Sequence, residues 1–186
     1  LAATDLPPDV ELSLRKALEQ EEPGSAARGA LETILTNISI SRQNSTPICQ
    51  DTGTPIFYVK YPEGWSTRKL RQQIETATAE ATQRSFLRPN SVDSLSGKNS
   101  GNNLGGDHFP SIHFEEVEGE ILTIDLMLKG GGCENVGAQY SLPNTALGAG
   151  RDLAGVRKVV LDAVHQAQGQ GCAPGILGVA IGGDRG

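Results

Sequence analysis

The sequence is poor in aromatic residues and in cysteine, and it has no long apolar segment. Phe, Trp and Tyr together make up 4% of 186 residues, and only three cysteines are present. An odd number of cysteines without any CxxC pair argues against a disulfide framework and against a zinc finger or ribbon. Because no stretch has membrane-spanning length and no signal-peptide pattern opens the chain, we expect a soluble, cytoplasmic protein.

Basic residues are also scarce relative to acidic ones. The chain has 16 Lys and Arg against 22 Asp and Glu, which gives a net charge of −6. A general nucleic-acid-binding surface needs clustered Lys and Arg, so the composition argues against one. A small anionic ligand is still compatible with a local group of basic side chains.

The apolar pattern predicts an α/β fold, in which a small mixed β-sheet is flanked by four helices. We expect a single domain over residues 1–186, cut short at the C-terminus, because a strand that feeds a glycine turn normally introduces another helix. Helical spacing predicts a helix at 8–20, then helices capped by Ser25, Ser66 and Asp152, the last running to 168 with Gly169 as its stop. Strands are expected at 56–60, at 111–129 as a hairpin around a glycine turn, and at 176–181.

The segment from residue 85 to residue 110 shows no periodicity. A loop of this length inside a compact domain is uncommon and is usually either functional or disordered. We interpret it as functional.

The loop around Cys49 gathers reactive side chains. Cys49, Gln50, Asp51 and Thr52 follow one another directly before an apolar run, so one turn could offer a soft ligand, an orienting amide and a proton carrier. The alternative is a small buried cysteine beside an ordinary turn. Cys133 and Cys172 also lie in glycine-bearing loops, which favours a site assembled by the fold.

Three widely spaced thiols fit a soft metal ion or an iron-sulfur cluster better than a carboxylate-type metal site. A cluster of four irons held by three thiolates keeps one iron open as a Lewis acid for a hydroxyl. A structural zinc would want a fourth ligand, and the three histidines are not obviously placed to supply it: His108, His113 and His165. A thiol nucleophile is the rival chemistry, but no Cys/His spacing indicates a base.

Three consecutive glycines, Gly130, Gly131 and Gly132, precede Cys133. Such a run weakens a strand and lets backbone N–H groups approach an anion. A flexible hinge is the alternative interpretation.

Taken in order, these motifs resemble the alpha region of class I fumarases and tartrate dehydratases, the iron-sulfur hydro-lyases. The resemblance spans nearly the whole chain and is specific as an ordered set. It is carried by Pro47 to Gly53, Phe86-Leu87-Arg88, Gly97 to Asn102, Lys129 to Asn135, Cys172-Ala173-Pro174 and Gly182-Gly183.

The resemblance implies reversible hydration of fumarate to malate, a step of the tricarboxylic acid cycle, with a 4Fe-4S cluster as cofactor. It implies that Cys49 and Cys172 are two of the three cluster ligands. Gln50 and Asp51 would contact substrate, with Asp51 donating a proton to the departing hydroxide. The remaining implied pocket residues are Arg88, whose fork-shaped guanidinium suits a carboxylate, the backbone of Gly130, Gly131 and Gly132, and Lys98 with Asn99 as walls.

The chain departs from the family pattern at two points. The third cluster cysteine of the family lies beyond residue 186, and the family's base and further carboxylate-binding groups come from a beta subunit or C-terminal domain. The resemblance therefore implies an oligomer with a beta partner. Cys133 stands where fumarases often have Ser and tartrate dehydratases Cys, so we interpret it as a pocket residue and only secondarily as a metal ligand.

Three alternatives stay open. Cys133 favours a tartrate dehydratase, whereas Glu134-Asn135 favours a fumarase. A non-catalytic scaffold without a cluster and a structural zinc-binding domain are the alternatives outside the hydro-lyases, and neither of them needs Gln50-Asp51, Arg88 and the glycine run together.

Overall fold

The computed structural model describes residues 2–93, 95–105, 109–172 and 175–182. It divides into two compact units, the first unit Leu1–Gly131 and the second unit Gly132–Gly186, and each is described here by itself. The expectation of a single domain stays a prediction. Among the described residues the α/β class is confirmed, with four α-helices and a three-stranded mixed sheet.

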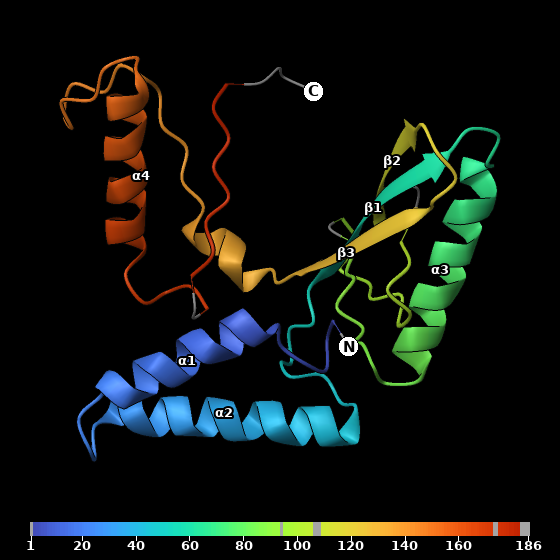
Figure 1. Ribbon diagram of the computed structural model, residues 1–186, viewed down its shortest axis with the longest axis horizontal. Helices are drawn as coiled ribbons and strands as arrows, with labels where there is room; N and C mark the ends of the chain where they lie inside the picture. The colour runs from blue at the N-terminus through green and yellow to red at the C-terminus, as the bar shows by residue number, and fades with distance from the viewer. Residues whose placement is uncertain (1, 94, 106–108, 173–174, 183–186) are drawn as a thin grey trace. The chain divides into compact units, whose positions relative to one another are not determined.

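Two helices open the first unit and pack against each other, α1 (Pro8–Gln20) and α2 (Ala26–Asn44) (Figure 1). Pro8 stands in the first turn of α1, where its missing N–H costs nothing. Ser25 caps α2 as predicted, its Oγ accepting the N–H of Arg28 at 3.1 Å. Leu14 and Ile38 are the buried apolar side chains of the pair.

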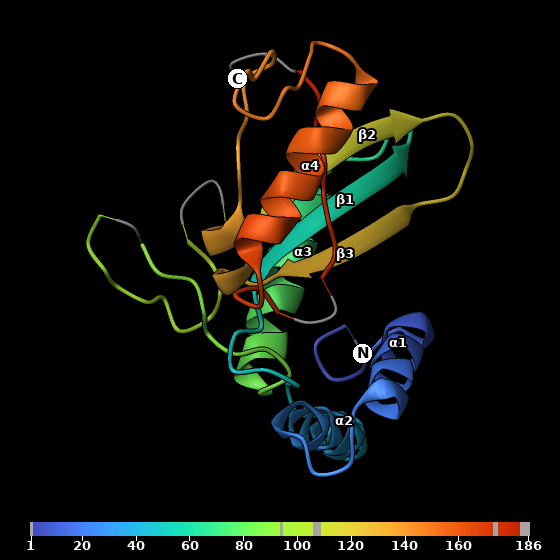
Figure 2. The ribbon, with the colours of Figure 1, turned by 90° about the vertical axis from the view of Figure 1, so that its left-hand side faces the viewer.

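The sheet has the order β2-β1-β3, with β1 (Thr54–Pro62) in the middle (Figure 2). β2 (Ser111–Val117) runs parallel to β1, and β3 (Thr123–Lys129) runs antiparallel to it. The predicted hairpin over 111–129 is therefore wrong: both strands exist, but β1 lies between them. Alternating apolar residues indicate which face of a strand is buried and carry no information on the partner strand.

Helix α3 (Thr67–Gln83) covers one face of the sheet. Ser66 caps it as predicted, accepting the N–H of Lys69 at 3.3 Å. Val59 of β1 packs against Leu70 and Ile74 of α3, and these three side chains are 1–5% exposed. Partly buried residues complete this core: Phe57, Tyr61, Ile112, Phe114 and Leu122.

The second unit contains a short 3-10 helix, η2 (Gly132–Val136), and α4 (Leu153–Ala167). The Asp152 side chain caps α4 as predicted, accepting the N–H of Gly155 at 2.7 Å. The helix ends at Ala167, one residue before the predicted end, and the residue that follows, Gln168, has a positive φ of 48°. The predicted strand at 176–181 is wrong, since this segment is not paired in a sheet and Ile176 is 83% exposed.

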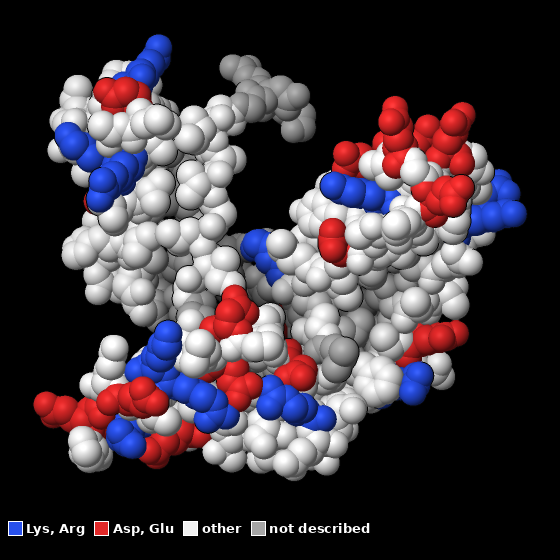
Figure 3. Space-filling model, viewed as in Figure 1, with Lys and Arg blue, Asp and Glu red and all other residues white. Residues whose placement is uncertain are grey.

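Charge is unevenly spread on the first unit. Figure 3 shows acidic side chains gathered over the end of the sheet where β2 leads to β3. The exposed acidic residues there are Glu115, Glu116, Glu118 and Glu120. This end of the sheet repels anions. Among the described residues no helix is both long and apolar enough to span a bilayer.

Candidate functional site

The Cys49 loop is anchored through the residue before it. The backbone N–H of Ile48 donates to the carbonyl oxygen of Ala3 at 2.9 Å. The side-chain amide of Asn37, on α2, donates to the Ile48 carbonyl oxygen at 2.7 Å. Both polar backbone groups of Ile48 are thereby fixed, one by the N-terminal segment and one by α2. Cys49 itself is exposed.

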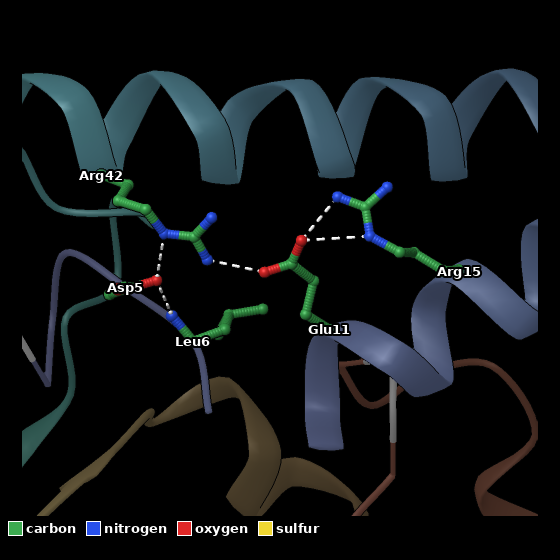
Figure 4. A network of polar contacts seen from close by, with 5 residues as sticks. All are labelled: Asp5, Leu6, Glu11, Arg15 and Arg42. Atoms are coloured by element: carbon green, nitrogen blue, oxygen red, sulfur yellow. Dashed lines mark hydrogen bonds and ion pairs between the residues drawn. The ribbon is translucent and has the colours of Figure 1, made fainter. Parts of the chain in front are cut away.

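A network of charged residues holds that N-terminal segment against α2 (Figure 4). The Arg42 guanidinium donates to Asp5 at 2.7 Å and to Glu11 at 2.6 Å, and Arg15 donates to the other oxygen of Glu11. The hydrogen bonds from Arg42 hold the pKa of Asp5 and the pKa of Glu11 below their ordinary values, because the ionised carboxylates accept them. Arg42 thus links the N-terminal segment, α1 and α2.

Within the loop, the thiol and the carboxylate share one turn. The backbone N–H of Asp51 points to the Sγ of Cys49 at 3.4 Å, and the Asp51 Oδ1 accepts the N–H of Gly53 at 3.1 Å. This second bond is an Asx turn, the local structure that Asp favours in loops. Asp51 is half-buried, whereas Gln50 is exposed.

The Arg88 segment lies directly beside this loop. The backbone N–H of Arg88 donates to the Oγ1 of Thr52, a buried side chain, at 2.9 Å. The side-chain amide of Asn90 lies 3.4 Å from the Gln50 carbonyl oxygen and 3.5 Å from the Asp51 Oδ1. The Arg88 side chain is exposed. Two segments far apart in sequence therefore place Arg88 and Asp51 in one neighbourhood.

The loop that carries Lys98 folds back on the Arg88 segment. The side-chain amide of Asn99 donates to the Pro89 carbonyl oxygen at 2.7 Å, and the Lys98 carbonyl oxygen accepts the N–H of Asp93 at 2.9 Å. Hydrogen bonds from Ser96 hold the pKa of Asp93 below its ordinary value. Lys98 is exposed.

The end of β3 contacts the loop at Gly53. A β-carbon built on Gly53 would lie 2.5 Å from the Lys129 carbonyl carbon and 2.8 Å from the Gly130 nitrogen. The start of the glycine run is therefore packed against the turn that carries Asp51. Gly130 is half-buried and Gly131 is exposed.

The predicted site residues divide between the two units. In the first unit, the contacts above join the segments that carry Cys49, Gln50, Asp51, Arg88, Lys98 and Gly130, and Gly131 is the next residue along the chain. Gly132, Cys133 and Cys172 belong to the second unit. There Gly171, next to the exposed Cys172, lies against Val136 of η2, the short helix that also contains Cys133. Ala173, Pro174 and Gly183 of the family motifs lie outside the described residues.

The described residues also bear on the structural-zinc alternative. No group of three or more His, Cys, Asp and Glu side chains suited to a metal ion occurs among the described residues. His113 stacks on Tyr58 with ring centroids 5.0 Å apart, and His108 lies outside the described part of the chain.

A groove of about 900 Å³ lies between α3 and Gly101, Asn102 and Leu104, and no predicted site residue lines it.

Sequence reasoning missed three polar residues of this region: Thr52 as an acceptor, and the asparagines Asn90 and Asn103. Asn103 is 1% exposed, has a positive φ of 58°, and hydrogen-bonds the Arg88 segment. The available signal was the density of Asn in residues 99–103, because Asn tolerates left-handed backbone and bonds to nearby backbone groups.

Comparison with known proteins shows to which family the chain belongs. Residues 1–186 match the family model described as fumarate hydratase (fumerase). A protein of Geobacillus stearothermophilus, whose name assigns it to the class I fumarate hydratases, is 50% identical over 98% of this chain and 36% of its own length. A Methanocaldococcus jannaschii protein named as an L(+)-tartrate dehydratase alpha subunit is 31% identical over 98% of this chain and 63% of its own length.

The alpha subunit of the L(+)-tartrate dehydratase of Escherichia coli K12 is 27% identical over 97% of this chain and 58% of its own length. The chain thus spans about a third of the Geobacillus relative and less than two thirds of the other two. Since the family model matches every residue of the chain, the protein belongs to the family of class I fumarate hydratases and tartrate dehydratase alpha subunits.

Proposed function

We propose that this chain is the alpha portion of a hydro-lyase that hydrates fumarate to malate reversibly. The observation that carries the proposal is the pairing of the Arg88 segment with the Asp51 turn, through the Arg88 to Thr52 and Asn90 to Asp51 contacts. The segment that carries a cation shaped for a carboxylate is then in contact with the turn that carries a carboxyl group able to move a proton, and a hydroxy dicarboxylate requires both groups. The 50% identity to the relative named as a fumarate hydratase supports the same reaction class.

In the proposed reaction, each residue has a separate task. Arg88 binds one substrate carboxylate, and Gln50 orients the substrate beside the turn. In the dehydration direction, Asp51 gives its proton to the hydroxyl that leaves as water. The backbone N–H groups of Gly130, Gly131 and Gly132 line the anion-binding side, and Lys98 stands at its rim. The proton on carbon is taken by a base that this chain does not supply.

The donor set fits an iron-sulfur cluster. Cys49 is exposed, so its sulfur is accessible to a cluster, and the sulfur accepts the backbone N–H of Asp51 at 3.4 Å. Cys49 and Cys172 would hold the cluster, with a third thiolate from residues that follow in longer relatives and Cys133 as a weaker candidate. When bound, a 4Fe-4S cluster with an open iron position supplies a Lewis acid for the substrate hydroxyl. Such chemistry suits the cytoplasm, where thiols stay reduced.

The proposal includes a beta partner, either a separate subunit or a later domain. Relatives named as alpha subunits support this view, because such a name implies a second kind of subunit. The partner would supply the base and further carboxylate-binding groups. An assembly of several alpha and beta portions is the proposed working form.

The test uses the intact enzyme with its beta portion, reconstituted anaerobically with iron and sulfide. We expect fumarate-dependent activity and brown colour in the wild type, and the loss of both activity and iron in Cys49→Ser. Cys133→Ser tests the weaker ligand candidate: iron retained in that variant assigns Cys133 to the pocket, and iron lost assigns it to the cluster. Retained activity in Cys49→Ser would reject the cluster assignment.

A second candidate is tartrate dehydration, favoured by Cys133 and by the relatives named as tartrate dehydratase alpha subunits. Comparing kcat/KM for malate and tartrate on the same enzyme decides between the two. A preference for tartrate would replace fumarate as the substrate and leave the hydro-lyase assignment in place.

A further inference from the structure

Asn103 is a buried side chain at the centre of the polar contacts behind Arg88. Its Oδ1 accepts the backbone N–H groups of Asn90 at 2.8 Å and Ser91 at 3.2 Å, and also the Ser91 hydroxyl at 3.2 Å. Its Nδ2 donates to the Arg88 carbonyl oxygen at 2.7 Å and to the Thr82 Oγ1 at 2.9 Å. Both donors and both acceptor lone pairs of the amide are thus used.

The backbone at Asn103 explains why this residue type occurs there. The φ of 58° lies in the left-handed region, which only Gly and, less readily, Asn and Asp adopt without a large steric cost. Gly would supply no amide, and Asp would lack the two N–H donors. Asn is therefore the residue type that satisfies both the backbone and the hydrogen bonds.

The segment that Asn103 fixes is the one that contacts the Asp51 turn. Arg88 donates its backbone N–H to Thr52, and the Asn90 side chain reaches Asp51. A continuous chain of hydrogen bonds therefore runs from Thr82, in the last turn of α3, through Asn103 to the turn that carries Asp51.

We propose that Asn103, held by Thr82, is a positioning residue that sets the placement of Arg88 relative to Asp51. The inference rests on the proposed function in so far as Arg88 binds a substrate carboxylate. Asn103 contacts neither substrate nor cluster in this scheme. Its effect passes through the Arg88 backbone, and it should therefore change substrate affinity more than the rate of the chemical step.

The helix offers a matched pair of threonines for the test. Thr82 and Thr78 are both buried, and each donates its hydroxyl to the carbonyl oxygen four residues earlier at 2.8 Å. Only Thr82 also accepts the Asn103 amide. Thr82→Val and Thr78→Val remove the same hydroxyl from the same helix, and they differ in the bond to Asn103.

Two measurements are made on the intact enzyme: steady-state kinetics with fumarate and malate, and hydrogen exchange of the backbone amides of Arg88, Asn90 and Ser91. For Thr82→Val we expect KM to rise about fivefold with kcat little changed. A change of about fivefold in KM corresponds to the free energy that one neutral hydrogen bond contributes. Exchange at Asn90 and Ser91 should also become faster. Thr78→Val should resemble wild type in both measurements, and Thr82→Ser should restore wild-type behaviour.

The outcomes separate this inference from the proposed function. Equal KM values and equal exchange in the two valine variants would overturn the role of Asn103 while leaving the hydro-lyase assignment intact. Faster hydrogen exchange without any change in KM would also overturn the proposal that Asn103 positions Arg88 for the substrate. A wild type that turns over no dicarboxylate would overturn the proposed function, and the exchange comparison would still decide whether Asn103 fixes the Arg88 segment.

Discussion

Gly53 lies so close to the backbone of Lys129 that no side chain fits between them. A β-carbon on Gly53 would meet the Lys129 carbonyl oxygen at 2.6 Å, below the 3.0 Å that real β-carbons respect. Gly53 also has a positive φ of 89°. Two independent constraints therefore require glycine at the point where the Cys49 loop meets the end of β3.

Replacing Gly53 by Ala should destabilise the first unit more than the same change at a glycine with open space around it. Gly64 is the matched control, with a φ of 81° and, apart from its own residue and its two chain neighbours, no atom within 4 Å of the point where its β-carbon would stand. We expect Gly64→Ala to lower the free energy of unfolding by about 1 kcal/mol, through backbone strain alone. Gly53→Ala should cost at least about twice that, since the strand end must also shift. Urea unfolding measures both, and equal losses would contradict the close approach.

Arg88→Lys should weaken binding of a dicarboxylate. Lys keeps the charge but cannot form the two parallel hydrogen bonds of a guanidinium, so we expect KM to rise about tenfold with kcat less affected. Arg84→Lys is the control, because the Arg84 guanidinium stacks 4.6 Å from the Phe86 ring centre in the same segment. Similar KM values in the two variants would argue against Arg88 as the carboxylate ligand.

Arg42 should make stability depend on pH on the acid side. It holds the pKa values of Asp5 and Glu11 below their ordinary values of 3.8 and 4.5. The contribution of Arg42 to the free energy of unfolding is therefore present at a pH above those ordinary values, and it is lost as the pH falls and the carboxylates protonate. The difference in urea midpoint between wild type and Arg42→Gln should be largest near neutral pH and shrink below about pH 4.

The control for this titration is Arg84→Gln, since Arg84 pairs with an aromatic ring and its effect should not vary over the same pH range. A midpoint difference for Arg42→Gln that stays constant down to about pH 3 would show that the two carboxylates do not depend on Arg42.

Asp152→Ala should destabilise the start of α4 by about 1 kcal/mol, the usual cost of losing an N-cap. The Asp152 carboxylate accepts the N–H of Gly155, and alanine leaves that donor without an acceptor from the cap. Asp152→Ser should recover most of the loss. Thermal unfolding followed by circular dichroism compares the three proteins, and identical melting of the Ala and Ser variants would exclude a capping role.

Features that depend on neighbouring residues were predictable from the sequence. The sequence predicts the caps Ser25, Ser66 and Asp152, because a cap and the N–H that it accepts lie three residues apart. The run of polar residues from Cys49 to Gly53 likewise predicts a turn. The structure has one there, closed by the hydrogen bond from the Gly53 N–H to the Asp51 side chain. The family resemblance, not periodicity, predicts that Arg88 and Lys98 belong to the same site.

Features that depend on distant partners were not predictable. Period two in residues 111–129 indicated two strands but could not show that β1 separates them. The apolar run at 176–181 predicts a buried strand, yet the described part of the second unit offers it no strand to pair with. Asn103 binds backbone groups of Arg88 and Asn90 through a single side chain, and such contacts leave no repeating pattern.

The central position of β1 in the sheet affects how the chain folds during its synthesis. β1 is synthesised before α3, while both of its neighbours in the sheet, β2 and β3, come after that helix. Until Val59 can pair with Phe114 and Ile124, the nascent chain carries an apolar strand with both edges open. Ribosome-bound chains in which β1 and α3 have left the exit tunnel, but β2 and β3 have not, should therefore show the most chaperone capture or aggregation, and the emergence of Lys129 from the tunnel should relieve it.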